Sequence, residues 1–252
     1  MSAQHRSRIF EKGDWQFRVA RQSEVDSTQL DSYFNLVVSG EFHSGKFETS
    51  EEQTVRFSRG STYRVSIADQ SLVVRKYYRG GLVRHFNKDL HFGFGVEPRP
   101  FREMDLLDNL VEEGFATTKP VFAAIQRVFA GSFYQGYLAT KELENHSNFL
   151  SMIVDSEKKN DKLAHAAGLA ADELLKRGVL HRDLHPGNVL VDNETGGVAI
   201  IDFDGFGLTE RAGSESDRIY LVERWARSIH KHQLNPMLIE NFKSGLESNG
   251  CS

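Results

Sequence analysis

The chain has 252 residues, of which 39% are hydrophobic and 26% charged, and its formal net charge is −4 at pH 7. This balance fits a globular protein of one large domain or two small lobes. It excludes a chain that is drawn as a whole to nucleic acid or anionic lipid. The single cysteine, Cys251, excludes a disulfide framework and a cysteine-rich zinc site. Residues 1–15 lack the apolar core of a signal peptide, and no apolar run approaches the ~20 residues of a membrane span. We therefore expect a cytoplasmic protein with no nucleic-acid partner, and leave peripheral contact with a membrane open.

The first half of the chain shows mainly the patterns of β-strands. Residues 1–50 are polar with scattered aromatic side chains, and we expect an N-terminal extension of unassigned role with one or two strands. Alternating apolar and polar residues then predict strands at 54–57, 62–67, 72–75, 121–124, 127–129 and 134–139. Between the third and fourth of these, a helix is expected to begin near Pro100, with Gly114 as its cap.

The second half of the chain is more helical. Leucines and alanines at helical spacing predict a helix at 161–177, with Asp161 as N-cap and Gly178 as terminator. Strands at 189–191 and 198–201 flank a run of turn-forming residues, which predicts a β-hairpin. An amphipathic helix at 217–231 and a short helix opened by Pro236 complete the chain.

The strongest chemical signal is the run HRDLHPGN at 181–188, followed by a second acidic residue after an apolar strand. Phosphoryl transfer needs one carboxylate to take the proton of the acceptor hydroxyl, and an amide oxygen and a second carboxylate to hold Mg²⁺ against the ATP phosphates. The spacing predicts Asp183 as the catalytic base and Asn188 and Asp202 as the metal ligands. An alternative is that these are ordinary turn residues, but that does not explain two acidic groups and an asparagine around a hairpin. The arrangement resembles the catalytic and metal-binding loops of the protein-kinase-like fold.

This resemblance implies a phosphate-binding side chain at the end of the strand 72–75. The residue in that place is Arg75, with Lys76 next, and strand alternation puts Val73 and Arg75 on one face. Arginine can bind phosphate, so both residues stay candidates, beside the alternative of solvated charges at a strand end. Glu103, in the first turns of the next helix, is predicted to pair with Arg75; the alternative is a surface glutamate favoured by the helix dipole.

The predicted glycine-rich loop is poor in glycine. Residues 58–63 lie between two predicted strands and contain a single glycine. The backbone amides of Gly60 and Ser61 could still contact phosphates, although a plain hairpin turn is almost as well supported.

Three segments indicate which class of acceptor would receive the phosphate: the run RKYYRGGLV at 75–83, residues 58–63 before it and residues 101–103 after it. These segments resemble the 3-deoxy-D-manno-octulosonic acid (Kdo) kinases of the lipopolysaccharide kinase family of Gram-negative bacteria, over residues 56–207. The resemblance implies ATP-dependent phosphorylation of Kdo in a lipid A precursor, at the cytoplasmic face of the inner membrane. Only fifty residues follow Asp202, which also favours a small-molecule or glycan acceptor over a polypeptide.

Three residues are candidates for contact with the acceptor. Arg79 and Arg84 belong to a basic stretch with aromatic neighbours that could receive the carboxylate and phosphates of such an amphiphile. The alternative is a solvated loop whose charges offset the acidic remainder. His185 could contact the acceptor and is equally well explained as a surface loop residue.

The sequence thus predicts an α+β protein with a two-lobed protein-kinase-like fold and a reduced C-terminal lobe. We expect an extension at 1–50, a β-rich N-lobe at 51–142 and a helical C-lobe at 143–252. The expected cofactors are ATP and Mg²⁺, and the expected partner is a Kdo-bearing lipid A precursor or another glycan. Two alternatives stay open: a small-molecule kinase of the aminoglycoside or choline type, and a non-catalytic kinase-like binding module.

Overall fold

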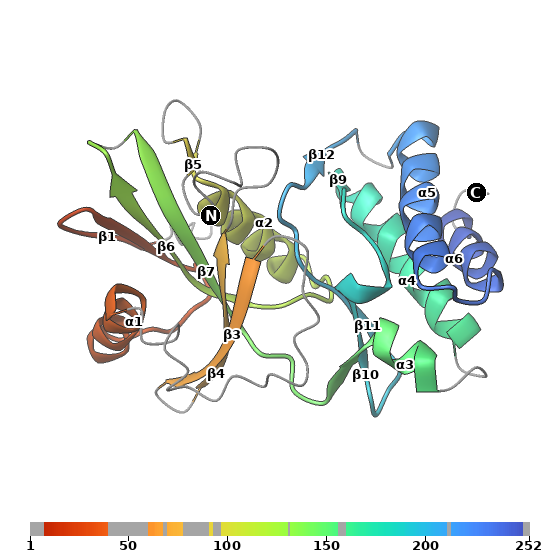
Figure 1. Cartoon of the computed structure of the whole chain (residues 1–252), viewed down its shortest axis with the longest axis horizontal. Coiled ribbons are helices and arrows are strands. Elements are labelled where there is room, and N and C mark those ends of the chain that lie inside the picture. Colours follow the sequence, from red (N-terminus) through yellow and green to blue (C-terminus); the bar gives the residue numbers. More distant parts are fainter. Residues whose placement is uncertain are drawn as a thin grey trace, which may run out of the picture. The chain divides into compact units, whose positions relative to one another are not determined.

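The structure is a computed structural model, and it describes residues 8–39, 60–67, 70–77, 91–92, 97–130, 132–155, 160–210 and 213–248. The predicted strand at 54–57 and the acceptor candidates Arg79 and Arg84 lie outside these residues. The chain forms two compact units, Met1–Glu142 and Leu143–Ser252 (Figure 1).

The first unit is built on a seven-stranded sheet whose strand pairs are all antiparallel. Its strands are β1 (Arg8–Lys12), β2 (Trp15–Val19), β3 (Gly60–Ile67), β4 (Gln70–Tyr77), β5 (His91–Phe92), β6 (Pro120–Val128) and β7 (Phe133–Lys141). The order is β1-β2-β6-β7-β4-β3, and β5 pairs with β7. Residues 8–19 belong to the predicted N-terminal extension, for which one or two strands were expected, and they supply two strands of this sheet. The two short strands predicted at 121–124 and 127–129 are one continuous strand, β6.

Successive side chains of a strand point to opposite faces of the sheet. Each face therefore carries side chains that can be covered, and one helix packs on each. Helix α1 (Ser27–Ser39) packs Tyr33 on Phe122, with ring centroids 5.0 Å apart, within a buried cluster that includes Val74. Helix α2 (Arg99–Glu112) contacts β6 and β7 and buries Met104 and Leu107. Its predicted start near Pro100 and its predicted cap are confirmed.

Gly114 follows α2 with φ +75°, a left-handed conformation that glycine adopts without strain. Its N–H donates to the carbonyl of Val111 (3.0 Å), and the next N–H, of Phe115, donates to the carbonyl of Leu110 (2.8 Å). These bonds satisfy carbonyls that the helix end leaves without partners, which is why α2 stops here.

The second unit is mainly helical, with short strands between its helices. The helices are α3 (Phe149–Asp155), α4 (Asn160–Lys176), α5 (Glu215–Lys231) and α6 (Met237–Glu247), with the short 3₁₀ turn η5 (Pro186–Asn188). The strands are β8 (His146–Asn148), β9 (Val179–Leu180), β10 (Val189–Asp192), β11 (Val198–Ile200) and β12 (Gly207–Leu208). The predicted hairpin is confirmed as the antiparallel pair β10 and β11.

Helix boundaries in this unit differ from prediction at two starts. Helix α4 already includes Asn160, so Asp161 lies in its first turn and is not its N-cap. Helix α5 begins at Glu215 because Ser214 forms a capping box with Asp217, a reciprocal pair of bonds that satisfies two end groups.

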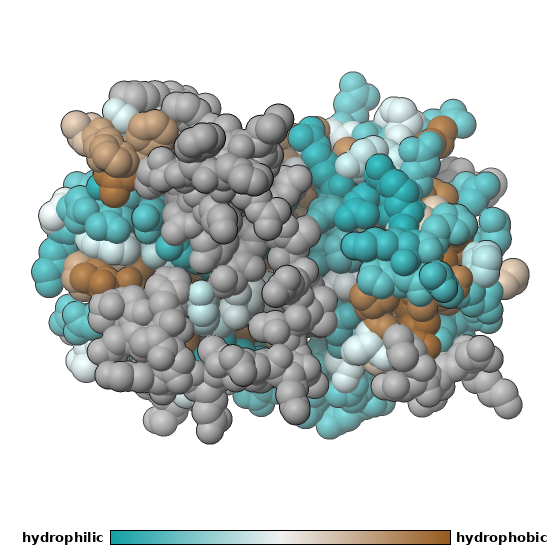
Figure 2. All heavy atoms as spheres, viewed as in Figure 1, coloured by the Kyte–Doolittle hydropathy of each residue, from teal (hydrophilic) through white to brown (hydrophobic). Residues whose placement is uncertain are grey.

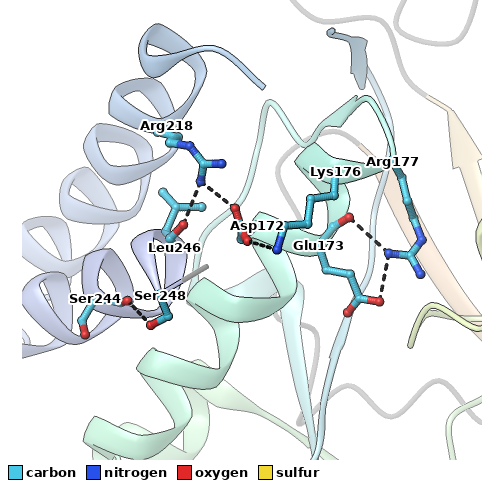
Figure 3. Close-up of polar contacts among 8 residues, drawn as sticks. All are labelled: Asp172, Glu173, Lys176, Arg177, Arg218, Ser244, Leu246 and Ser248. Atoms are coloured by element: carbon cyan, nitrogen blue, oxygen red, sulfur yellow. Dashed lines mark hydrogen bonds and ion pairs between the residues drawn. The ribbon is translucent and has the colours of Figure 1, made fainter. Parts of the chain in front are cut away.

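Close packing and a buried charge hold the three long helices together. A Cβ atom on Gly168 of α4 would lie 2.1 Å from the carbonyl oxygen of Phe242 on α6, so only glycine permits this approach. Asp172 of α4 is 1% exposed and accepts a hydrogen bond from Arg218 of α5 at 2.6 Å (Figure 3). Arg218 also donates to the carbonyl of Leu246 on α6 at 2.7 Å.

The described surface is mainly hydrophilic on the face drawn in Figure 2, with hydrophobic residues in small groups. Among the described residues, no helix is both long enough and apolar enough to span a membrane.

Candidate active site

The predicted catalytic loop, residues 181–188, is tied to the residues that follow β11. The ring of His181 is buried, and its Nε2–H donates to the carbonyl of Ile201 at 3.0 Å. In turn, the N–H of Ile201 donates to the carbonyl of Asn188 at 3.0 Å. Burial lowers the pKa of His181, so the ring is neutral at neutral pH. His181 is therefore a structural residue that holds the loop, and Asp202, next to Ile201, is brought beside Asn188.

Asn188 is buried, yet only one end of its amide has a partner in the part of the chain that the structure describes. Its Nδ2 donates to the backbone carbonyl of Asp183 at 3.0 Å, which fixes the orientation of the amide. Its Oδ1 accepts no hydrogen bond there. A buried acceptor left unpaired costs about 1–3 kcal/mol. An amide oxygen held in this way fits a ligand of a hard cation such as Mg²⁺.

Asp202 has a left-handed backbone, with φ +64°. Aspartate tolerates this conformation better than most residues, because its short side chain can form local hydrogen bonds. Here Oδ1 of Asp202 accepts from the N–H of Asp204 at 3.4 Å, and Gly205 continues the turn with φ +81°. The carboxylate is half-buried. The structure thus brings together Asn188 and Asp202, the two predicted metal ligands.

The predicted base, Asp183, forms an ion pair that the sequence did not indicate. Its Oδ1 accepts from Nε of Arg224 at 2.9 Å and also from Nη2 of the same guanidinium. Arg224 lies on α5, one turn beyond Tyr220, whose hydroxyl donates to the backbone carbonyl of Arg182 at 2.8 Å. Helix α5 therefore contacts two consecutive residues of the predicted catalytic loop. The only signal in the sequence was an arginine four residues after a tyrosine on an amphipathic helix, and nothing local links it to the loop.

His185 organises the same loop. Its Nδ1 accepts from the N–H of Gly187 at 3.0 Å, so that the proton of the neutral ring is on Nε2. Burial lowers the pKa of His185 to about 4, which leaves the ring uncharged at neutral pH. If His185 contacts the acceptor substrate, it can donate one hydrogen bond, from Nε2–H, and it contributes no charge.

In the first unit, the predicted pairing of Arg75 with Glu103 is present. Nη2 of Arg75 donates to Oε2 of Glu103, and the same carboxylate oxygen accepts from the hydroxyl of Tyr77. Arg75 also donates to the Tyr77 hydroxyl at 2.9 Å, and Glu103 is buried. The sequence did not single out Tyr77, although it lies two residues after Arg75 on the same face of β4.

Lys76 lies on the opposite face of β4. Its Nζ is 5.8 Å from the ring centroid of Tyr137, and the residue is buried. Of the two candidates left open by the sequence, Arg75 is thus the one that Glu103 orients.

Gly60 and Ser61 lie in a strand, whereas the sequence predicted a loop at these residues; their backbone contact with phosphates stays a prediction. They are the first two residues of β3, where they pair with Tyr77 and Lys76 in the antiparallel ladder. Strand pairing with β4, extended beyond the predicted 62–67, places them in a strand and not in a turn. Residues 58 and 59 lie outside the described part of the chain.

A comparison with known protein families shows which family the chain belongs to. The model of the lipopolysaccharide kinase (Kdo/WaaP) family matches residues 45–218. The chain belongs to this family. Relatives named 3-deoxy-D-manno-octulosonic acid kinase include one from Haemophilus influenzae (strain Rd), 30% identical over 199 residues, covering 76% of this chain and 81% of the relative. Another, from Xylella fastidiosa (strain M23), is 31% identical over 176 residues, covering 69% of this chain and 67% of the relative.

A solved structure, titled WaaP in complex with acyl carrier protein, is similar to this chain with a TM-score of 0.53 and 15% identity. The similarity covers 77% of this chain and 76% of that chain. The predicted kinase-like α+β fold and the predicted membership of the lipopolysaccharide kinase family are both confirmed. As a member of this family, the chain is a phosphotransferase.

Proposed function

We propose that this protein is an ATP-dependent kinase that phosphorylates a hydroxyl group of Kdo in a lipid A or lipopolysaccharide precursor. The observation that carries the proposal is the set of hydrogen bonds that join the loop 181–188, which contains Asp183 and Asn188, to Ile201, the neighbour of Asp202. Membership of a family that includes Kdo kinases supports the choice of acceptor.

Asp183 is the residue proposed to receive the proton of the acceptor hydroxyl. Its carboxylate is partly exposed, with 34% of the side chain accessible, and its position is fixed by Arg224. A carboxylate held in place near the attacking oxygen contributes mainly by orientation, because phosphoryl transfer requires little covalent chemistry from the protein.

Asn188 and Asp202 are the residues proposed to hold Mg²⁺. When bound, the ion would neutralise charge on the phosphates. The unpaired Oδ1 of Asn188 and the carboxylate of Asp202 are oxygen donors of the kind that Mg²⁺ prefers. The hydrogen bond from Nδ2 to the carbonyl of Asp183 keeps Oδ1 turned away from that carbonyl, so the amide is oriented before a ligand arrives.

Arg75 is the residue proposed to bind the ATP phosphates. Its partner Glu103 is buried, and Tyr77 donates to the same carboxylate, so the guanidinium is held by two contacts. Residues Gly60 and Ser61 stay weaker candidates for phosphate contact, through the backbone of β3.

The acceptor is proposed to be lipid-linked, which would bring the protein into peripheral contact with the cytoplasmic face of the inner membrane. Arg79 and Arg84, from the basic run after β4, are proposed to contact its anionic groups, with His185 as a further candidate.

The test is transfer of labelled phosphate from ATP, with Mg²⁺ present, to a Kdo-bearing lipid A precursor, with the Kdo-free lipid as control. We expect label only on the Kdo-bearing lipid. Label on soluble amino alcohols or sugars instead would favour the small-molecule kinase. Binding of Mg²⁺ and ATP without transfer to any acceptor would favour the non-catalytic module.

A further inference from the structure

We propose that Arg224 binds the carboxylate of the acceptor sugar and thereby selects an acidic acceptor. This inference rests on the proposed function, because it assigns the acceptor hydroxyl to Asp183. It assigns to Arg224 a role beyond that of holding the base.

The contacts of Arg224 leave part of its guanidinium for another ligand. A guanidinium has five N–H donors in a planar fork, and the two contacts with Asp183 use Nε and Nη2. Both fall on the same oxygen, Oδ1, so this ion pair does not use Oδ2. Within the described ranges, no other hydrogen bond or ion pair of Arg224 is found, and 23% of its side chain is accessible.

A second arginine on the same helix shows what a purely structural pair looks like. Arg218 contacts Asp172, which is 1% exposed, and donates as well to the carbonyl of Leu246. That pair joins three helices inside the unit. Arg224 instead contacts a carboxylate with 34% of its side chain accessible, on the loop that carries the proposed base.

The negative charge of the acceptor sugar explains why a guanidinium beside Asp183 would help to bind it. Kdo is a sugar acid, and it has to approach a site that already carries the carboxylates of Asp183 and Asp202. Like charges repel in such a site, whereas a guanidinium can bind a carboxylate through two parallel hydrogen bonds. A cation in contact with the base can therefore attract the carboxylate while the hydroxyl meets Asp183.

The position of the guanidinium is fixed by the helix that carries it. Trp225, the next residue, is fully buried, stacks on Phe242 with ring centroids 4.3 Å apart, and donates to the carbonyl of Leu238 at 3.1 Å. Tyr220 holds the loop backbone one turn earlier. A recognition group on a helix anchored in this way loses little freedom when it binds.

The experiment combines changes in the enzyme with a change in the acceptor. kcat/KM is measured for the wild type, Arg224→Gln and Arg227→Gln, on the Kdo-bearing lipid and on the same lipid with the Kdo carboxylate as its methyl ester. Arg227 is exposed on the same helix and provides the matched loss of charge. We expect the wild type and Arg227→Gln to prefer the acid by roughly 10- to 100-fold, the range of a charge-assisted hydrogen bond, and Arg224→Gln to lose that preference.

Three outcomes would overturn the inference, and they are distinguishable. Equal activity of the wild type on acid and ester would do so even if Arg224→Gln failed to fold. An Arg224→Gln variant that is slower on both acceptors by the same factor, with the preference intact, would show that Arg224 only positions Asp183. A wild type that transfers phosphate to neither lipid would overturn the proposed function itself, and this inference with it.

Discussion

Arg75 of β4 and Glu103 of α2 form an ion pair that the hydroxyl of Tyr77 completes. The guanidinium also lies over the Tyr77 ring, 4.7 Å from its centroid. The three side chains come from two elements on the same face of the sheet, so packing of α2 on the sheet is what positions the arginine. A buried glutamate thus orients the cation of this strand, which is an arginine.

The first prediction separates Arg75 from its neighbour Lys76. Arg75→Met should raise KM for ATP and lower kcat/KM by ten-fold or more, as expected for loss of hydrogen bonds from a charged group (about 1.5–3 kcal/mol). Lys76→Met should change KM for ATP far less, because Lys76 lies on the other face of β4 and contacts the Tyr137 ring. Steady-state kinetics with varied ATP measure both. A larger effect at Lys76 would reassign the phosphate contact.

The second prediction concerns the base. Asp183→Asn should lower kcat by roughly 10²- to 10⁴-fold, the usual contribution of general base catalysis, while ATP binding survives because the carboxylate is proposed to meet the acceptor hydroxyl and not the nucleotide. Single-turnover transfer and fluorescent nucleotide binding would be measured on the same preparation. Turnover at the wild-type rate would remove Asp183 from the role of base.

The third prediction concerns the unpaired amide oxygen of Asn188. Asn188→Ala should raise the Mg²⁺ concentration needed for half-maximal activity and reduce the stabilisation of the protein by Mg²⁺ with ATP in thermal unfolding, because ligand binding stabilises the folded state. Asn148→Ala is the matched control. Asn148 supports the same loop, donating to the carbonyl of Gly187 at 2.7 Å, and its Oδ1 already accepts from Leu150. It should lower stability without shifting the Mg²⁺ requirement, and a shift as large as that of Asn188→Ala would contradict the assignment.

The sequence was informative where the physical cause is local. Alternation along strands predicted parts of β3, β4 and β7, and turn-forming residues predicted the hairpin of β10 and β11. The spacing of Asp183, Asn188 and Asp202 is itself short in the chain, so the loop could be identified without a structure.

Contacts between distant residues could not be predicted in this way. Arg224 is 41 residues from Asp183, and its helix shows only an amphipathic pattern. The pairing of β2 with β6 likewise joins segments far apart in the chain, so the sequence predicts strands here without showing which sheet they join. Lys76 and Arg75 are adjacent in sequence, and the ion pair of Arg75 with Glu103 of α2 is what distinguishes them.

The last prediction is a pH dependence of stability that originates at Asp172. Burial by itself would raise the pKa of Asp172, but its hydrogen bonds with Lys176 and Arg218 outweigh it and hold the pKa below its usual value. A carboxyl whose pKa is lowered by folding stabilises the protein above its unfolded pKa of about 3.9, and this stabilisation is lost as the pH falls through the folded value.

At neutral pH, Asp172→Asn should lower the free energy of unfolding by about 1–3 kcal/mol, less than for a fully buried pair because both cations are partly exposed. Urea unfolding from neutral pH to about pH 3 should show that difference shrinking below about pH 4. Glu173→Gln, which removes the surface pair with Arg177, should cost at most about 1 kcal/mol. If the difference between wild type and Asp172→Asn stayed constant down to the lowest pH, the ionised pair would not be its origin.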